Sequence, residues 1–81
     1  MVSVNEIVGL IDGVSGDTTV PKNIRRALEE AKGRLTSPDE LTVRVSAAIY
    51  SIESVSEDVN MPQHARMQIW NILSALESIK K

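Results

Sequence analysis

Apolar residues recur along the whole chain at the three- and four-residue intervals of an α-helix. They form four stripes, which are separated by short segments rich in Gly, Pro, Ser and Asp. The stripes are Val4, Ile7, Val8, Ile11 and Val14; Val20, Ile24, Ala27, Leu28, Ala31 and Leu35; Leu41, Val45, Ala48, Ile49, Ile52 and Val55; and Met61, Ala65, Ile69, Ile72, Leu76 and Ile79. No stretch alternates with the two-residue period of a β-strand. The pattern therefore predicts four helices and an all-α fold.

Helix-boundary signals refine this prediction. Ser3 and Glu6 have the spacing of a capping box, and we expect the first helix to end near residue 14. Pro21, behind a threonine cap, fits the first turn of the second helix, and Ser37 with Pro38 predicts the start of the third. Connections of only a few residues make successive helices antiparallel neighbours. The simplest fold that buries all four stripes is a single-domain, up-and-down four-helix bundle of residues 1–81.

The chain also contains an internal repeat. A shift of 41 positions aligns residues 2–40 with residues 43–81 without a gap, and ten of the 39 aligned pairs are identical. These pairs are Val2/Val43, Val4/Val45, Ile11/Ile52, Val14/Val55, Ser15/Ser56, Asp17/Asp58, Pro21/Pro62, Arg25/Arg66, Leu35/Leu76 and Ser37/Ser78. The alignment predicts two duplicated helical hairpins, each of which covers the apolar face of the other. We expect the two halves to be related by a pseudo-twofold axis.

The best-matched segments are DTTVPKNIR and DVNMPQHAR, residues 17–25 and 58–66. Each begins with an Asp before the second helix of its hairpin and ends with an Arg inside that helix. This spacing predicts ion pairs between Asp17 and Arg25 and between Asp58 and Arg66, which would fix the hairpin turns. The alternative is that the repeated Asp and Arg contact a partner.

Two resemblances follow from these segments. The stretch DTTVPKNIRRALEEAKGRL resembles the second half of a HEAT repeat, and the 41-residue period lies in the range of that repeat. The chain as a whole more closely resembles uncharacterised archaeal protein family 0147, particularly along VPKNIRRALEEAKGRLTSPDELTVRVSAAIYSIESVSEDVNMPQHARMQIWNILSALE. This second resemblance implies a small, all-helical cytoplasmic protein from an archaeon and implies no activity.

Composition adds information about compartment and size. Of the 81 residues, 42% are hydrophobic, with no Phe, one Trp and one Tyr, so the core has to be aliphatic. The absence of Cys is compatible with a reducing compartment. The N-terminal stretch carries Glu6 and Asp12 among its apolar residues, which fits neither a signal peptide nor a membrane span. We therefore expect a cytoplasmic protein that does not contact membranes.

No set of residues has the spacing of a catalytic, metal or cofactor site. The chain has one His and no Cys, and His64 is expected to be solvated near the start of the last helix. The two glycines of GVSGD lack the Lys and the preceding strand of a phosphate-binding loop. We expect that the protein is not an enzyme and needs no cofactor.

Two function classes remain. The first, which we favour, is a non-enzymatic protein–protein interaction module or adaptor that binds an unidentified protein or a second copy of itself. The second is a nucleic-acid or ribonucleoprotein accessory that uses the basic face of the second helix. That face consists of Lys22, Arg25, Arg26, Lys32 and Arg34. The net charge of −2 argues against a dedicated nucleic-acid binder, because binding to phosphates needs concentrated positive charge.

The repeat also indicates where a partner would bind, because side chains present in only one half are not explained by shared architecture. Met67, Trp70 and Leu73 stand where the first half has Arg26, Glu29 and Lys32, and Tyr50 stands where it has Gly9. One interpretation is that Trp70 and Tyr50 fill the core. The other is that Tyr50, Met67, Trp70 and Leu73 form an exposed contact surface.

Overall fold

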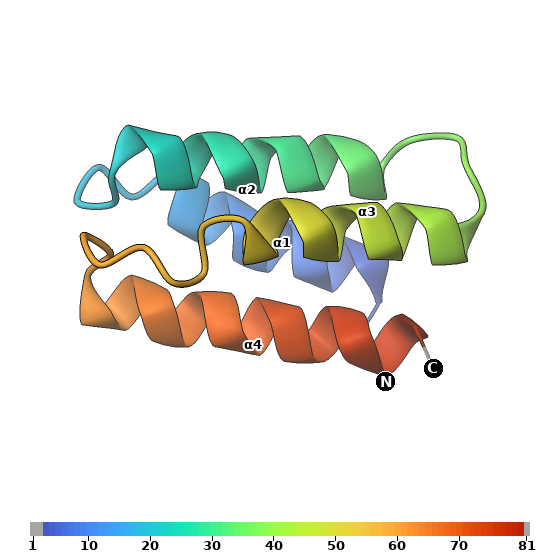
Figure 1. The fold of residues 1–81 in the computed structure, drawn as a ribbon. Helices are drawn as coiled ribbons and strands as arrows, with labels where there is room; N and C mark the ends of the chain where they lie inside the picture. Colours follow the sequence, from blue (N-terminus) through green and yellow to red (C-terminus); the bar gives the residue numbers. More distant parts are fainter. Residues whose placement is uncertain (1–2, 81) are drawn as a thin grey trace.

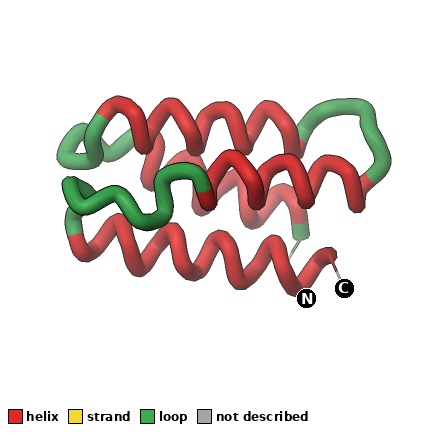
Figure 2. The backbone as a smooth tube through the Cα atoms, viewed as in Figure 1, coloured by secondary structure: helices red, strands yellow, loops and turns green. Residues whose placement is uncertain are grey.

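The computed structural model describes residues 3–80, which form a bundle of four antiparallel α-helices (Figure 1). The helices are α1 (Val4–Ser15), α2 (Lys22–Leu35), α3 (Leu41–Glu53) and α4 (Gln63–Lys80). Only helices and loops occur within this described part of the chain (Figure 2). The predicted all-α, up-and-down bundle is confirmed.

The helices pack in a closed arrangement. Helix α1 packs against α2 and α4, and helix α3 packs against the same two helices. Over residues 3–80, neither α1 and α3 nor α2 and α4 approach each other directly, so each of these pairs lies across a diagonal of the bundle. Stacked HEAT-type layers would instead place α1 beside α3. The weaker resemblance therefore does not describe how the hairpins pack.

The core is aliphatic and lies on the bundle axis. Its buried members are Ile7, Ile11, Val14, Val20, Ile24, Leu28, Ala31, Leu35, Val45, Ala48, Ile49, Ile52, Met61, Ala65, Ile69, Ile72, Leu73 and Leu76. All but one of these belong to the predicted stripes, and the exception is Leu73. Among the stripe residues, Leu41 is an outlier, because 42% of its surface is exposed. The helical periodicity thus predicted the core almost completely.

The N-terminus of α3 differs from the prediction. Helix α3 begins at Leu41 with Glu40 as its N-cap, whereas Ser37 and Pro38 lie in the preceding turn. The Thr36 hydroxyl donates to the Lys32 carbonyl at 3.0 Å, so the chain is still completing the end of α2 at that point. Packed helix axes lie about 8–10 Å apart, and crossing that distance takes roughly three extended residues. The residues between Thr36 and Leu41 are used for this crossing.

Two loops meet at one end of the bundle. The α1–α2 loop and the α3–α4 loop both lie at the left in Figure 2, whereas the α2–α3 loop lies at the opposite end.

No helix in residues 3–80 has the length and apolarity needed to cross a membrane.

Candidate functional site

Three of the four residues of the predicted contact surface are exposed. The exposed fractions are 77% for Tyr50, 63% for Met67 and 60% for Trp70, whereas Leu73 is only 8% exposed. The interpretation that Trp70 and Tyr50 fill the core is therefore wrong. Successive residues of a helix are rotated by about 100°, so Trp70 points well away from the buried Ile69. We call Tyr50, Met67 and Trp70 the α3–α4 patch.

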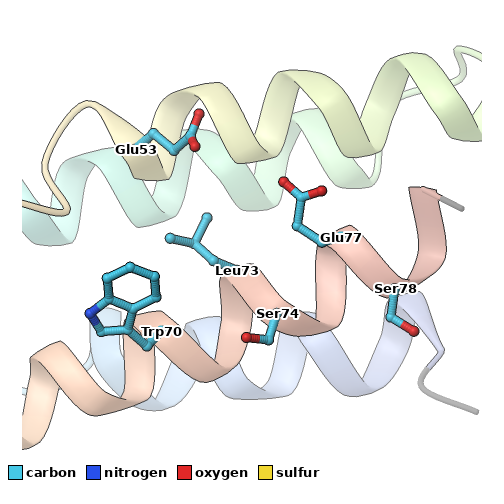
Figure 3. Close-up of a pocket in the computed structure, with 6 residues that line it drawn as sticks. All are labelled: Glu53, Trp70, Leu73, Ser74, Glu77 and Ser78. Carbon is cyan, nitrogen blue, oxygen red and sulfur yellow. The ribbon is translucent and has the colours of Figure 1, made fainter.

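Trp70 of this patch also lines a hollow of about 410 Å³ between α3 and α4 (Figure 3). It is lined by Glu53 from the end of α3 and by Trp70, Leu73, Ser74, Glu77 and Ser78 from α4. In Figure 3 the side chains of Leu73 and Glu77 point from α4 toward α3. No Lys, Arg or His nitrogen lies within 4.0 Å of either carboxylate in the described part of the chain. The hollow therefore combines one aromatic wall with two acids that form no ion pair with another residue in 3–80.

Glu53 and Glu77 were not among the site residues predicted from the sequence. The alignment of the halves contained part of the signal, because Glu53 matches Asp12 and Leu73 matches Lys32. In the structure Lys32 Nζ lies 2.8 Å from Asp12 Oδ1, which joins α2 to α1. The hydrogen bond to Asp12 raises the pKa of the Lys32 ammonium above its ordinary value. The second half thus keeps the acid of this pair and replaces the base with leucine.

Two residues of the predicted basic face of α2 form ion pairs with acidic side chains. Lys32 pairs with Asp12, and Arg34 Nη2 lies 3.8 Å from Glu30 Oε1. Arg25 is half-buried, and its Nε has no hydrogen-bond partner within residues 3–80. Of these five residues, only Lys22 and Arg26 are exposed and form no ion pair with another described residue. The five residues do not form one continuous cationic surface.

Asp17 at the α1–α2 turn is held by the other hairpin. Its Oδ1 accepts hydrogen bonds from the Thr19 amide at 2.9 Å and the Thr19 hydroxyl at 2.6 Å. Its Oδ2 lies 2.9 Å from His64 Nε2, at the start of α4. The Thr19 hydroxyl bond, followed by the His64 bond, lowers the pKa of Asp17 from 3.8 to about 2. The predicted ion pair with Arg25 is wrong, since no Asp17–Arg25 pair occurs among the described contacts.

Asp58 at the α3–α4 turn has matching contacts. Its Oδ1 accepts from the Asn60 amide at 2.8 Å, and its Oδ2 accepts from Asn23 Nδ2 of α2, also at 2.8 Å. The Asn23 bond is the main reason that the pKa of Asp58 is lowered. Arg66 Nη2 donates to the backbone carbonyl of Asp58 at 3.2 Å and forms no ion pair with its carboxylate. The second predicted ion pair is therefore wrong as well.

The two sets of contacts correspond under the 41-residue shift. Asn23 matches His64, and Asp17 matches Asp58, so each hairpin uses the same position to hold the carboxylate of the other. Reciprocal contacts of this kind are what a twofold axis produces. They agree with the predicted repeat, which superposition of the two halves would test. His64 is solvent-exposed, as expected, with 55% of its side chain accessible, but it also links the two hairpins through its contact with Asp17, which was not expected.

The Asp17, Thr19 and His64 side chains resemble a catalytic triad only in composition. In a triad the imidazole uses one nitrogen for the nucleophile and the other for the carboxylate. Here Thr19 Oγ1, at 3.3 Å, and Asp17 Oδ2 both approach His64 Nε2. The Thr19 hydroxyl already donates to Asp17, so the imidazole does not activate it.

Among residues 3–80, no group of three or more His, Cys, Asp or Glu side chains is arranged to hold a metal ion.

Acidification from about pH 5 to about pH 2 is expected to destabilise the bundle partly through these carboxylates. The pKa of Asp17 is near 2 in the folded protein and 3.8 at its ordinary value, and that of Asp58 is shifted in the same direction. Their contribution is therefore present above the ordinary pKa and is lost as the pH falls through the folded value. Urea unfolding at several pH values should show a shallower acid dependence for the Asp17→Asn/Asp58→Asn variant than for the natural chain. An equally shallow dependence for Glu57→Gln, in an exposed loop, would contradict this assignment.

Comparison with known proteins gives a consistent result. The model of a family described as "Uncharacterised protein family (UPF0147)" matches residues 2–79. The chain is 47% identical over 79 residues to a UPF0147 protein of Pyrococcus furiosus, with 95% of this chain and 85% of that protein covered. It is 42% identical over 74 residues to a UPF0147 protein of Archaeoglobus fulgidus, with 91% of this chain and 85% of that protein covered.

Solved structures are similar as well. The crystal structure of the unknown function protein MMP1188 has a TM-score of 0.90 and 46% identity, covering 96% of this chain and 90% of that one. The crystal structure of a UPF0147 protein from Thermoplasma acidophilum has a TM-score of 0.87 and 33% identity, covering 93% of this chain and 89% of that one. The four-helix fold is thus shared with experimentally determined structures.

Proposed function

The chain belongs to the uncharacterised protein family UPF0147, which is represented in archaea, and we propose that it acts as a small, non-enzymatic protein–protein interaction module. The observation that carries this proposal is the exposure of the α3–α4 patch, Tyr50, Met67 and Trp70. Tyr, Trp and Met are enriched where proteins contact one another. A partner that covers these side chains would remove a large apolar area from water.

The distribution of exposed apolar side chains supports a contact surface in the second half. Among the described residues, the large exposed hydrophobic side chains are Leu10, Leu41, Val43, Tyr50, Val59, Met67 and Trp70. Leu10 is the only one of these within residues 2–40. The two halves share one helical plan, so this asymmetry is not required by the fold. We place the module in the cytoplasm, as the composition favours.

The partner is either another protein or a second copy of the chain. The alternative, a nucleic-acid accessory, has weaker support because Lys32 and Arg34 are engaged in ion pairs and Arg25 is half-buried. The remaining exposed cations of that face, Lys22 and Arg26, offer few phosphate contacts.

Affinity capture with two matched double variants tests the proposal. Met67→Arg/Trp70→Glu gives the patch the residues that the first half carries at the matched positions, and Lys22→Gln/Arg26→Gln removes the exposed basic residues. We expect a nuclease-resistant complex with the natural chain. Affinity should fall roughly 30-fold or more in the patch variant, because buried Trp residues dominate interface energies, and should be unchanged in the basic variant.

Both variants alter exposed positions and should retain the helical circular dichroism spectrum of the natural chain. Self-association is followed in parallel by analytical ultracentrifugation. Salt-sensitive binding to nucleic acid that is lost in the basic variant, and retained in the patch variant, would support the accessory role and contradict the interaction module.

A further inference from the structure

Among residues 3–80, no ion pair joins α3 to α4, whereas one joins α1 to α2 at the matched interface. In the first half Lys32 Nζ of α2 lies 2.8 Å from Asp12 Oδ1 of α1. At the matched positions the second half has Leu73 and Glu53. The acid is retained on α3, whereas the side chain that would neutralise it is absent. The first half therefore shows that an ammonium group fits beside the acid at this helix–helix interface.

The surroundings of Glu53 also favour a cation. Glu77, from α4, lines the same hollow and adds a second carboxylate (Figure 3). Trp70 lines it with an indole ring, whose face attracts ammonium and guanidinium groups. Leu73 supplies an apolar wall against which a methylene chain would pack. The volume of about 410 Å³ lies within the usual range of about 300–1,000 Å³ for ligand sites.

We propose that the hollow lined by Glu53, Trp70 and Glu77 binds a lysine side chain of the protein partner, which deepens the interaction-module function and rests on it. The lysine ammonium takes the place of Lys32 Nζ in the other half and lies between the two carboxylates. Its methylene chain packs between Trp70 and Leu73. A charge-assisted hydrogen bond to each acid orients the side chain.

A protein lysine fits this surface better than a free polyamine does. Tyr50 lies one helical turn before Glu53 on α3, so the two share a face of that helix. Met67 lies one turn before Trp70 on α4. Both Tyr50 and Met67 are exposed, each one turn from a residue that lines the hollow, and a slender polyamine would leave them uncovered. A polypeptide that carries the lysine would cover them with neighbouring residues.

Trp70 provides a direct probe of the hollow because it is the only Trp in the chain. We would titrate the protein with a short peptide in which lysine alternates with alanine, and follow Trp70 fluorescence and the indole N–H resonance. The same peptide with every lysine acetylated removes the charge and keeps most of the side chain. We expect the acetylated peptide to bind at least about tenfold more weakly.

Variants locate the binding within the hollow. Glu53→Gln and Glu77→Gln are each expected to weaken binding of the lysine peptide about tenfold, because each removes one charge-assisted bond. Glu57→Gln is the matched control, since it removes the same charge from an exposed loop residue that does not line the hollow. It should leave the affinity unchanged.

Several results would overturn the proposal. They are a lysine peptide that does not perturb Trp70, equal binding of the acetylated peptide, and an equal loss in the Glu57→Gln control. Tighter binding of spermidine than of the peptide, with the same dependence on Glu53, would assign the hollow to a free cation instead. A protein complex that is lost in Met67→Arg/Trp70→Glu but survives Glu53→Gln/Glu77→Gln would retain the interaction surface and refute the lysine site alone.

Discussion

Replacing Leu76 with alanine is expected to lower the free energy of unfolding by about 2–5 kcal/mol. The Leu76 side chain is fully buried in the core, so truncation removes its packing contacts and leaves a cavity. Leu35, which occupies the matched position in the first half, is also fully buried. Leu35→Ala should therefore be destabilising to a similar extent. Urea-induced unfolding followed by circular dichroism measures both changes.

The control for this comparison is Val59→Ala, because Val59 is 89% exposed. A surface substitution of this kind should change the free energy of unfolding by no more than about 0.5 kcal/mol. If a leucine truncation prevents folding, the milder matched substitutions Ile11→Val and Ile52→Val are compared instead. Each is expected to lower the free energy of unfolding by about 0.5–1.5 kcal/mol. Losses that differ severalfold between matched positions would contradict equivalent roles of the two halves in the core.

The fold could be predicted from sequence because its determinants are local. Apolar spacing fixes which face of each helix is buried, and Ser3 Oγ accepts from the Glu6 amide at 3.2 Å, as the capping-box spacing predicted. The start of α3 could not be predicted from Ser37 and Pro38. It depends on the distance between two packed helices, which no local signal contains.

The contacts at the hairpin turns were mispredicted for a related reason. The Asp–Arg pairs were inferred from proximity in sequence, whereas Asp17 bonds with His64, 47 residues away, and Asp58 bonds with Asn23, 35 residues away. These contacts follow only from how the hairpins face each other. The aligned halves contained a usable signal, since Asn23 and His64 occupy matched positions, each the second residue of its helix, α2 or α4.

The exposure of Trp70 was open at the sequence level because two arguments conflicted. A core without Phe would gain volume from an indole, which favoured burial. However, Trp70 lies outside the apolar stripe of α4. The stripe residues that α4 contributes to the core are Ala65, Ile69, Ile72 and Leu76. The position of Trp70 on the helix therefore determined its exposure, and the volume of its side chain did not. The hollow beside Trp70 needs the packing of α3 on α4 and could not be derived from either helix alone.

Cutting the chain between Pro38 and Asp39 is expected to abolish most of the helical structure of both fragments. Helix α2 buries its stripe partly against α3, and α1 partly against α4, so each hairpin depends on the other for burial. The helices are 12 to 18 residues long, and isolated helices of about that length are marginal in water. Fragments near 40 residues without disulfides or metals rarely fold alone. Far-ultraviolet circular dichroism of each purified fragment measures the loss.

An equimolar mixture of the two fragments should regain the helical signal and a cooperative thermal transition, because α2 meets α3 and α1 meets α4 again. The matched control uses a C-terminal fragment that carries Ile72→Asp. This change puts a carboxylate at a fully buried position, so that mixture should stay largely unfolded. A hairpin that keeps its helical signal and its own cooperative transition when alone would show that residues 1–81 comprise two independent folding units. In that case burial between the hairpins would not be what stabilises the bundle.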